Sequence, residues 1–94
     1  MNPMPAEVRG EEIEADVLHR LLRRGCWGGR YLPVRSLVNW MGKRVGEDGR
    51  RVRKAIDNLH KAGLLLKHKG GETISLNTRR KKEIIEYIDR YLVP

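Results

Sequence analysis

The chain has 94 residues, which fits one domain with a single core of three or four helices and leaves too little room for a deep catalytic cleft. Charged residues make up 34% of the chain and the net charge is +8, a balance that favours nucleic acid first and an anionic membrane second. No apolar run approaches the ~18 residues needed to span a bilayer, no signal peptide is recognisable, and a lone cysteine excludes an internal disulfide, so we expect a cytoplasmic protein.

The first helix is predicted after a short tail. Residues 1–9 contain two prolines and no periodicity, which predicts a flexible tail before a domain over residues 10–94. Acidic residues then crowd the first turn of a helical pattern and arginines the last, as the helix dipole prefers, and Gly25 ends the pattern. The apolar stripe of this helix consists of Ile13, Val17, Leu18, Leu21 and Leu22.

A glycine-rich turn over residues 26–30 separates this helix from the second one. Tyr31 and Leu32 predict a short strand, and Pro33 suits the first position of a helix. We expect Gly42 to end that helix and residues 43–47 to form a turn. The apolar face of the second helix is Val34, Leu37, Val38 and Met41.

The third helix, predicted over about residues 48–62, has one apolar face and one basic face. Asp48 is a suitable N-cap, and Gly63 suits the left-handed residue that follows a helix. The core stripe is Val52, Ala55, Ile56 and Leu59. At 100° per residue, the opposite face carries Arg50, Lys54, Asp57 and Lys61, flanked by Arg51, Arg53 and Asn58.

A hairpin over about residues 64–76 follows, with Gly70 and Gly71 as its tight turn. Its predicted register places Lys69 opposite Glu72, Lys67 opposite Ile74, and Leu65 opposite Leu76. Asn77 or Thr78 then caps a last helix that ends at about residue 92. Its apolar positions are Ile84, Ile85, Ile88, Tyr91 and Leu92.

This order of helices and strands resembles the winged helix-turn-helix family over roughly residues 11–92. The densest match is the run from Ile56 to Leu65, which is similar to the family's junction between recognition helix and wing. The resemblance implies a mainly helical α+β fold and a DNA-binding transcription regulator of the small archaeal or prokaryotic type. It also implies that the third helix enters the major groove of duplex DNA and that the hairpin is the wing.

The resemblance and the residue chemistry together nominate a set of nucleic-acid contacts. Arginine bonds guanine bidentately and asparagine does the same to adenine, while lysines and hairpin glycines suit phosphate. The full set is Arg50, Arg51, Arg53, Lys54, Asn58, Lys61, Lys67, His68, Lys69, Arg79 and Arg80. The alternatives are a solvated helix face with ordinary ion pairs, a plain hairpin with charged edges, and basic side chains that splay into solvent at the start of the last helix.

Other kinds of site have less support in the sequence. Ile84, Ile88 and Tyr91 have the spacing of a short coiled-coil seam, which predicts a homodimer, with closure of the monomer's own core as the alternative. The histidines and Cys26 lack the spacing of metal ligands, and no catalytic set is recognisable, so we expect no cofactor and no enzymatic activity.

Two rival functions remain open. One is a ribosome-associated RNA-binding protein. The other is a winged helix that docks on protein, which an exposed apolar patch around Trp27 or Trp40 would favour.

Overall fold

A computed structural model describes residues 8–92, apart from the side chain of Asp48. Residues 1–7 of the predicted tail and the last two residues of the predicted domain therefore lie outside the described part. Val8, by contrast, packs against the hydrophobic core, and its carbonyl accepts a hydrogen bond from Arg51, so the chain is attached to the domain before the first helix begins.

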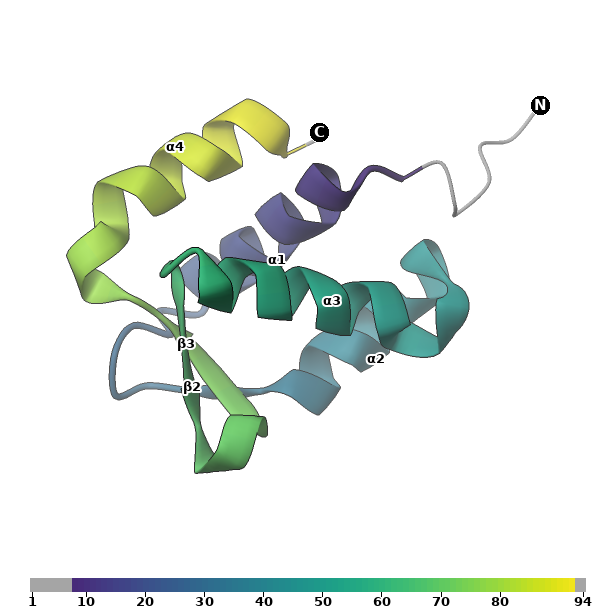
Figure 1. The fold of residues 1–94 in the computed structure, drawn as a ribbon, viewed down its shortest axis with the longest axis horizontal. Coiled ribbons are helices and arrows are strands. Elements are labelled where there is room, and N and C mark those ends of the chain that lie inside the picture. Colours follow the sequence, from purple (N-terminus) through teal and green to yellow (C-terminus); the bar gives the residue numbers. More distant parts are fainter. Residues whose placement is uncertain (1–7, 93–94) are drawn as a thin grey trace.

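The described chain forms four α-helices and a three-stranded antiparallel sheet, which confirms the predicted mainly helical α+β class (Figure 1). The sheet order is β1-β3-β2, with β3 in the centre. Short 3-10 turns precede α3, link β2 to β3, and precede α4. In chain order the elements are α1 (Gly10–Arg23), β1 (Leu32–Pro33), α2 (Val34–Val45), α3 (Arg50–Lys61), β2 (Leu65–His68), β3 (Thr73–Leu76) and α4 (Lys81–Tyr91).

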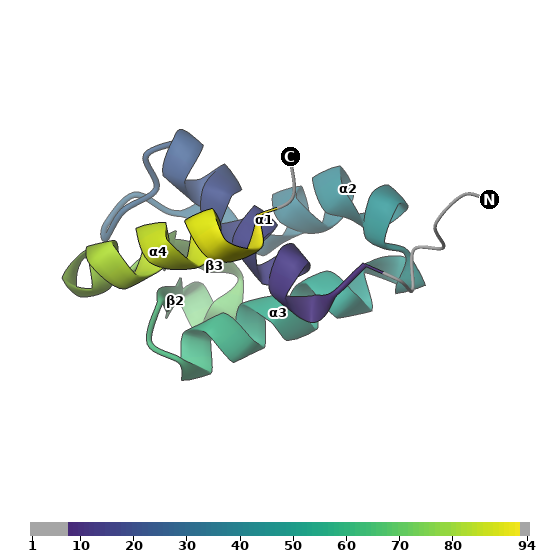
Figure 2. The ribbon, with the colours of Figure 1, turned by 90° about the horizontal axis from the view of Figure 1, so that it is seen from above.

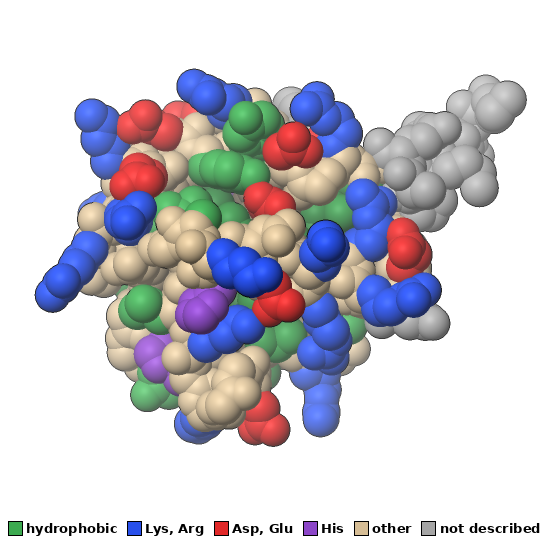
Figure 3. Space-filling view, in the orientation of Figure 1, with side chains coloured by type: hydrophobic (Ala, Val, Ile, Leu, Met, Phe, Trp, Pro, Cys, Tyr) green, Lys and Arg blue, Asp and Glu red, His purple; other side chains and the backbone are tan. Residues whose placement is uncertain are grey.

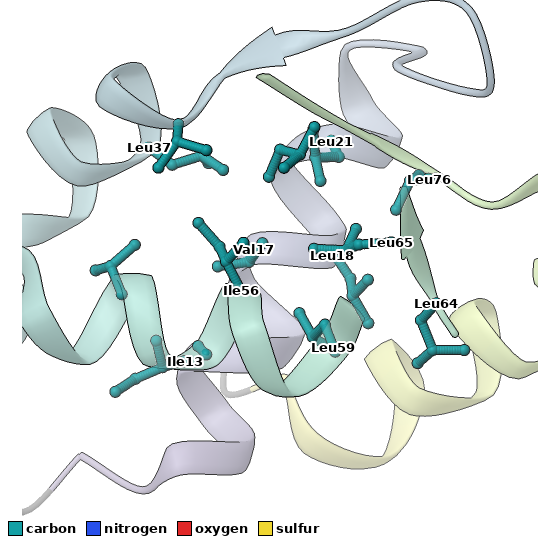
Figure 4. Close-up of a cluster of buried hydrophobic side chains, with 14 of the residues drawn as sticks. Ile13, Val17, Leu18, Leu21, Leu37, Ile56, Leu59, Leu64, Leu65 and Leu76 are labelled. Atoms are coloured by element: carbon teal, nitrogen blue, oxygen red, sulfur yellow. The ribbon is translucent and has the colours of Figure 1, made fainter. Parts of the chain in front are cut away.

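Helix α1 lies in the centre of the fold, with α3 and α4 packed against it (Figures 1 and 2). Leucine, isoleucine and valine side chains from α1, α2, α3 and the hairpin meet in one core (Figure 4). Val17, Leu18 and Leu21 of α1 are completely buried there. Full burial of a side chain of this size stabilises the folded state by about 1.5–3 kcal/mol relative to exposure, so these residues of α1 contribute strongly to the stability of the core.

Two glycines end α1 and α3 as the sequence predicts. Gly25 and Gly63 have φ values of +64° and +84°, the left-handed conformation that a side chain disfavours. At each helix end, the glycine and the next residue donate their amide hydrogens back to the last turn, to Leu22 and Leu21 in α1 and to His60 and Leu59 in α3. This paired hydrogen-bonding pattern satisfies carbonyls that a helix end leaves unpaired.

The second helix is longer than predicted, and the expectation that Gly42 ends it is wrong. Helix α2 continues through Gly42 to Val45, because Val45 is fully buried and extends the apolar stripe by one turn. Gly46, at φ +82°, takes the terminal position instead. At the other end, α2 begins at Val34, one residue later than predicted, because Pro33 occupies the N-cap position and belongs to β1.

Helix α3 also begins one residue later than an Asp48 cap implies. Its first residue is Arg50, and the capping position is held by Gly49. Gly49 ends a 3-10 turn over Glu47–Gly49 and has φ +79°. Gly49 packs against the Val38 side chain of α2, so it determines how closely the start of α3 approaches α2.

Two of the three predicted hairpin pairs are confirmed: Leu65 pairs with Leu76 and Lys67 with Ile74. The third, Lys69 with Glu72, is not a strand pair, because the last paired residues are His68 and Thr73. Lys69–Gly71 form a 3-10 turn in which Lys69, Gly70 and Gly71 all have positive φ, and the Glu72 amide donates to the Lys69 carbonyl at 3.3 Å. The short strand β1 lies one residue later than predicted and pairs with β3 on its other edge.

Helix α4 packs against the core of its own chain, which is the alternative to the predicted dimer seam. Ile84 and Ile88 are only 0% and 7% exposed, because they are buried within the chain. Tyr91 is half-buried and its ring contacts that of Tyr87, with centroids 4.8 Å apart. The predicted last helix starts with a 3-10 turn over Thr78–Arg80. Asn77 caps this turn, because its side-chain oxygen accepts a hydrogen bond from the Arg79 amide.

We expect Tyr87→Phe to lower the free energy of unfolding by about 1 kcal/mol, because the Tyr87 hydroxyl donates a hydrogen bond from α4 to Glu14 of α1. Burial and this bond raise the pKa of Tyr87 above its ordinary value of 10.0, so the contribution is present below pH 10 and declines as the pH rises further. Urea unfolding at pH 7 measures the loss. Tyr91→Phe is the control, and an equal effect of both variants would contradict a specific role for the bond.

Candidate nucleic-acid interface

The solvent-facing side of α3 carries a row of basic residues. Arg50, Arg53, Lys54 and Lys61 are all exposed, and Asp57 lies among them. Helix α3 buries its opposite side, including Val52 and Leu59, against α1 and α2, so core packing fixes the direction in which the row points. We call Arg50, Arg53, Lys54, Asp57 and Lys61 the α3 surface. Figure 3 shows that lysine and arginine side chains gather over α3 and the hairpin with few acidic ones between them.

Two predicted base contacts lie at the edge of α3 that faces α1. Arg51 is half-buried; its guanidinium donates to the Val8 carbonyl and its Nε lies 3.7 Å from a carboxylate oxygen of Glu47. Asn58 is exposed, but its amide donates to Glu14 at 3.2 Å. Both side chains therefore have partners within the chain: Asn58 connects α3 to α1, and Arg51 connects α3 to the segment before α1 and to the turn before α3.

The hairpin is connected to the α3 surface by an ion pair. Lys67 Nζ lies 2.7 Å from Asp57 Oδ1, although the two residues come from different elements. The hydrogen bond from Lys67 is the main cause that holds the pKa of Asp57 below its ordinary value of 3.8. The Asp57 carboxylate therefore stays ionised near neutral pH, and the contact shows that one face of the hairpin lies beside α3.

His68 and Lys69 project from the other side of the hairpin. Successive residues of a strand point to opposite faces, so His68 lies on the outer face of the sheet when Lys67 points to α3. His68 Nε2 lies 3.0 Å from Ser75 Oγ, which donates to the Gly28 carbonyl at 2.7 Å. Since the serine hydrogen is used in that bond, we assign Nε2 of His68 as the donor. The exposed Tyr31 ring covers His68 at 4.2 Å between centroids, with Lys69 Nζ 5.8 Å from that ring.

A groove that sequence reasoning missed lies between the start of α2, α3 and the hairpin turn. It has a volume of about 640 Å³, and Arg35, Arg53 and Lys69 line it together with Glu72. The Val34 amide donates to the Glu72 carbonyl at 2.9 Å, so the turn is held against the first turn of α2. Arg35 was not among the predicted contacts. In the sequence, the one feature that pointed to Arg35 as a contact was its position in the first helical turn after Pro33, where backbone amides lack a partner within the helix.

Arg79 and Arg80 lie beside the carboxyl end of α3. The Asn77 side chain donates to the Gly63 carbonyl at 2.8 Å, which joins the start of the last helix to the end of α3. Arg80 covers Gly63, and its Nη1 contacts both carboxylate oxygens of Glu83 at 3.2 Å. Arg79 is exposed. The pair therefore extends the basic surface past Lys61, although Glu83 compensates part of its charge.

The tryptophans are accompanied by cations. Trp40 is 41% exposed, but the Arg24 guanidinium stacks over its ring at 4.0 Å. Trp27 is half-buried with Lys81 Nζ 5.9 Å from its ring. Each tryptophan therefore has a cation beside its ring, while part of the Trp40 ring stays exposed.

The described residues also bear on metal sites and on membrane-spanning helices. Residues 8–92 contain no group of three or more histidine, cysteine or acidic side chains placed to hold a metal ion. Within the same range, every helix is too short or too polar to cross a membrane. Comparison of the chain with protein-family models, with curated proteins and with solved structures gave no match.

Proposed function

We propose that this protein is a winged-helix, non-enzymatic regulator of transcription that binds duplex DNA, with α3 as the recognition helix and the β2–β3 hairpin as the wing. The observation that carries the proposal is the position of the hairpin beside the basic side of α3, where Lys67 of the hairpin contacts Asp57 of α3. A helix and a hairpin that lie side by side in this way present cations along one continuous face. The proposal concerns a single chain acting in the cytoplasm without a cofactor.

The proposed mechanism divides the basic residues into two roles. Lysines of the α3 surface and of the hairpin would contact phosphates and release their condensed counterions, which supplies affinity without sequence preference. Arg50 and Arg53 would reach base edges in the major groove, where a guanidinium bonds guanine bidentately. The groove beside Arg35 would receive a phosphate of the same duplex, since Arg35, Arg53 and Lys69 line it against the single carboxylate of Glu72. Arg51 and Asn58 would position α3 rather than read bases.

A salt titration by fluorescence anisotropy tests the proposal. We expect a labelled random duplex to bind with a steep dependence on salt: release from about six phosphates lowers the affinity about 10³-fold between 50 and 200 mM. Preference for a structured RNA at equal salt would replace the proposal with the ribosome-associated alternative. Absence of binding to either ligand near 150 mM salt would leave docking on protein as the better explanation.

We expect Asp57→Asn to raise the duplex affinity about threefold to tenfold at 100 mM salt. The substitution removes a carboxylate from the middle of the α3 surface and frees Lys67 to contact phosphate. Asp89→Asn, on the exposed side of α4, changes the net charge equally and serves as the control. An equal gain from both variants would mean that net charge, and not the place of Asp57, governs the affinity.

A further inference from the structure

A second cluster of basic side chains lies away from the α3 surface, on the last turns of α1 and the adjoining edge of α2. We call Arg20, Arg23, Arg24 and Arg44 the arginine patch. None of them belongs to the interface proposed above. Figure 2 shows α3 along one side of the molecule, and α2 with the last turns of α1 along the other. The patch and the α3 surface therefore point in different directions.

Three of the four arginines, Arg20, Arg24 and Arg44, have partners within the fold that orient them. Asp16 has a side chain only 9% exposed; its Oδ1 lies 3.0 Å from Arg20 Nε and its Oδ2 lies 3.5 Å from Arg44 Nη2. Asp16 Oδ2 is buried and makes no hydrogen bond within the described residues, so the ion pair with Arg44 is what compensates the burial of its charge. Arg24 is fixed differently, by stacking on Trp40 and by donating to the Arg20 carbonyl at 3.4 Å.

The charge of the patch is only partly balanced. Asp16 is the one carboxylate among the described residues that pairs with these arginines. Arg23 and Arg24 are exposed and border a hollow of about 460 Å³ on α1, which Asp16, His19 and Arg20 complete. Pre-oriented guanidinium groups lose little side-chain entropy on binding, and their forked donors match phosphate oxygens. The chemistry of the patch therefore suits a polyanion rich in phosphate.

We propose that the arginine patch binds a second duplex, so that one chain bridges two segments of DNA. The inference rests on the proposed function for the first duplex. The shortest dimension of the molecule is 22 Å, and a straight duplex of about 15 base pairs is only about 50 Å long. DNA of this length resists bending around so small a body, so one short duplex cannot reach both surfaces. Occupation of both surfaces therefore requires two duplexes.

A bridging assay tests the inference, with one 15-base-pair duplex on beads and a second, labelled one in solution. We expect the parent protein to retain the labelled duplex on the beads. The double variant Arg23→Gln, Arg24→Gln leaves Arg20 and Arg44, the partners of Asp16, intact. It should reduce retention of the labelled duplex about tenfold, while the affinity for a single duplex stays within twofold. Lys82→Gln with Arg90→Gln removes the same charge from exposed positions of α4 and should still bridge.

A direct signal comes from Trp40. The chain has two tryptophans, so Trp27→Phe leaves Trp40 as the only one. We expect its emission to change in a second phase of a duplex titration, after the first site is full, and this phase should vanish when Arg23→Gln and Arg24→Gln are added. A change confined to the first phase would overturn the inference.

The outcomes separate this inference from the proposed function. If the parent binds one duplex through the α3 surface but does not bridge, the inference fails and the proposed function stands. If bridging survives in the Arg23→Gln and Arg24→Gln protein, pairing of two chains explains it and the patch does not. If substitutions on the α3 surface leave single-duplex affinity unchanged, the proposed function fails. A labelled polyglutamate peptide that binds the patch and resists displacement by duplex would identify an acidic protein as the partner and overturn the inference.

Discussion

Replacing Gly49 by alanine is expected to lower the free energy of unfolding by about 3 kcal/mol. Gly49 has φ +79°, a conformation that costs a side-chain-bearing residue roughly 1–2 kcal/mol. The added Cβ would also lie 2.4 Å from Val38 Cγ1, well inside van der Waals contact. Relief of that overlap requires α2 and α3 to move apart, and overpacking of this kind typically costs about 1–3 kcal/mol.

Urea unfolding of Gly49→Ala measures this loss, and Gly42→Ala is its matched control. Gly42 lies inside α2, and a Cβ there meets nothing within 4 Å, so alanine should stabilise the protein by up to about 1 kcal/mol. A loss below about 1 kcal/mol for Gly49→Ala would mean that the junction between α2 and α3 tolerates rearrangement. In that case α3 would not be held rigidly enough to present a fixed surface.

The second large effect is expected on binding: Arg50→Ala combined with Lys54→Ala should weaken duplex affinity about 100-fold at 100 mM salt. Loss of an arginine that contacts a base costs about 1–3 kcal/mol, and loss of a lysine–phosphate contact reduces the salt slope by about one. Both side chains are exposed. Arg50 also opposes the helix dipole at the start of α3, so its removal should leave stability within about 0.5 kcal/mol.

Anisotropy titrations at several salt concentrations measure both the affinity and the slope. Lys82→Ala with Arg90→Ala removes the same formal charge from α4 and should change affinity less than threefold at 100 mM salt. If the two double variants lose affinity equally, binding reflects overall charge and α3 is not the recognition helix. A circular dichroism spectrum identical to that of the parent is required of each variant.

Local patterns predicted most of the elements. The stripes of α1 and α3 follow helical spacing, and Gly25, Gly63 and the two turn glycines occupy the positive-φ positions where the sequence predicts helix ends and a tight turn. The end of α2 could not be predicted in the same way. From the local sequence, Gly42 and Gly46 are equally plausible ends of the helix. The helix ends at Gly46 because Val45 is buried by residues distant in sequence, which is a tertiary effect.

The same limit applies to the candidate interface. Helical spacing correctly placed Arg50, Lys54 and Lys61 on the exposed side of α3. It could not show that Arg51 and Asn58, which flank that side, would find hydrogen-bond partners in Val8 and Glu14, because these residues are distant in sequence. The groove beside Arg35 combines residues that are distant in sequence, and only packing brings them together.

The central place of α1 has a consequence for how the chain folds during synthesis. Helix α1 precedes α3 and α4 in the chain, and these are the helices that cover it. Until Ile84 and Ile88 of α4 have been added, the core around α1 has only part of its cover. A nascent chain that has reached only the hairpin therefore leaves apolar surface of α1 accessible to chaperones and proteases, and the native core forms only after α4 has emerged.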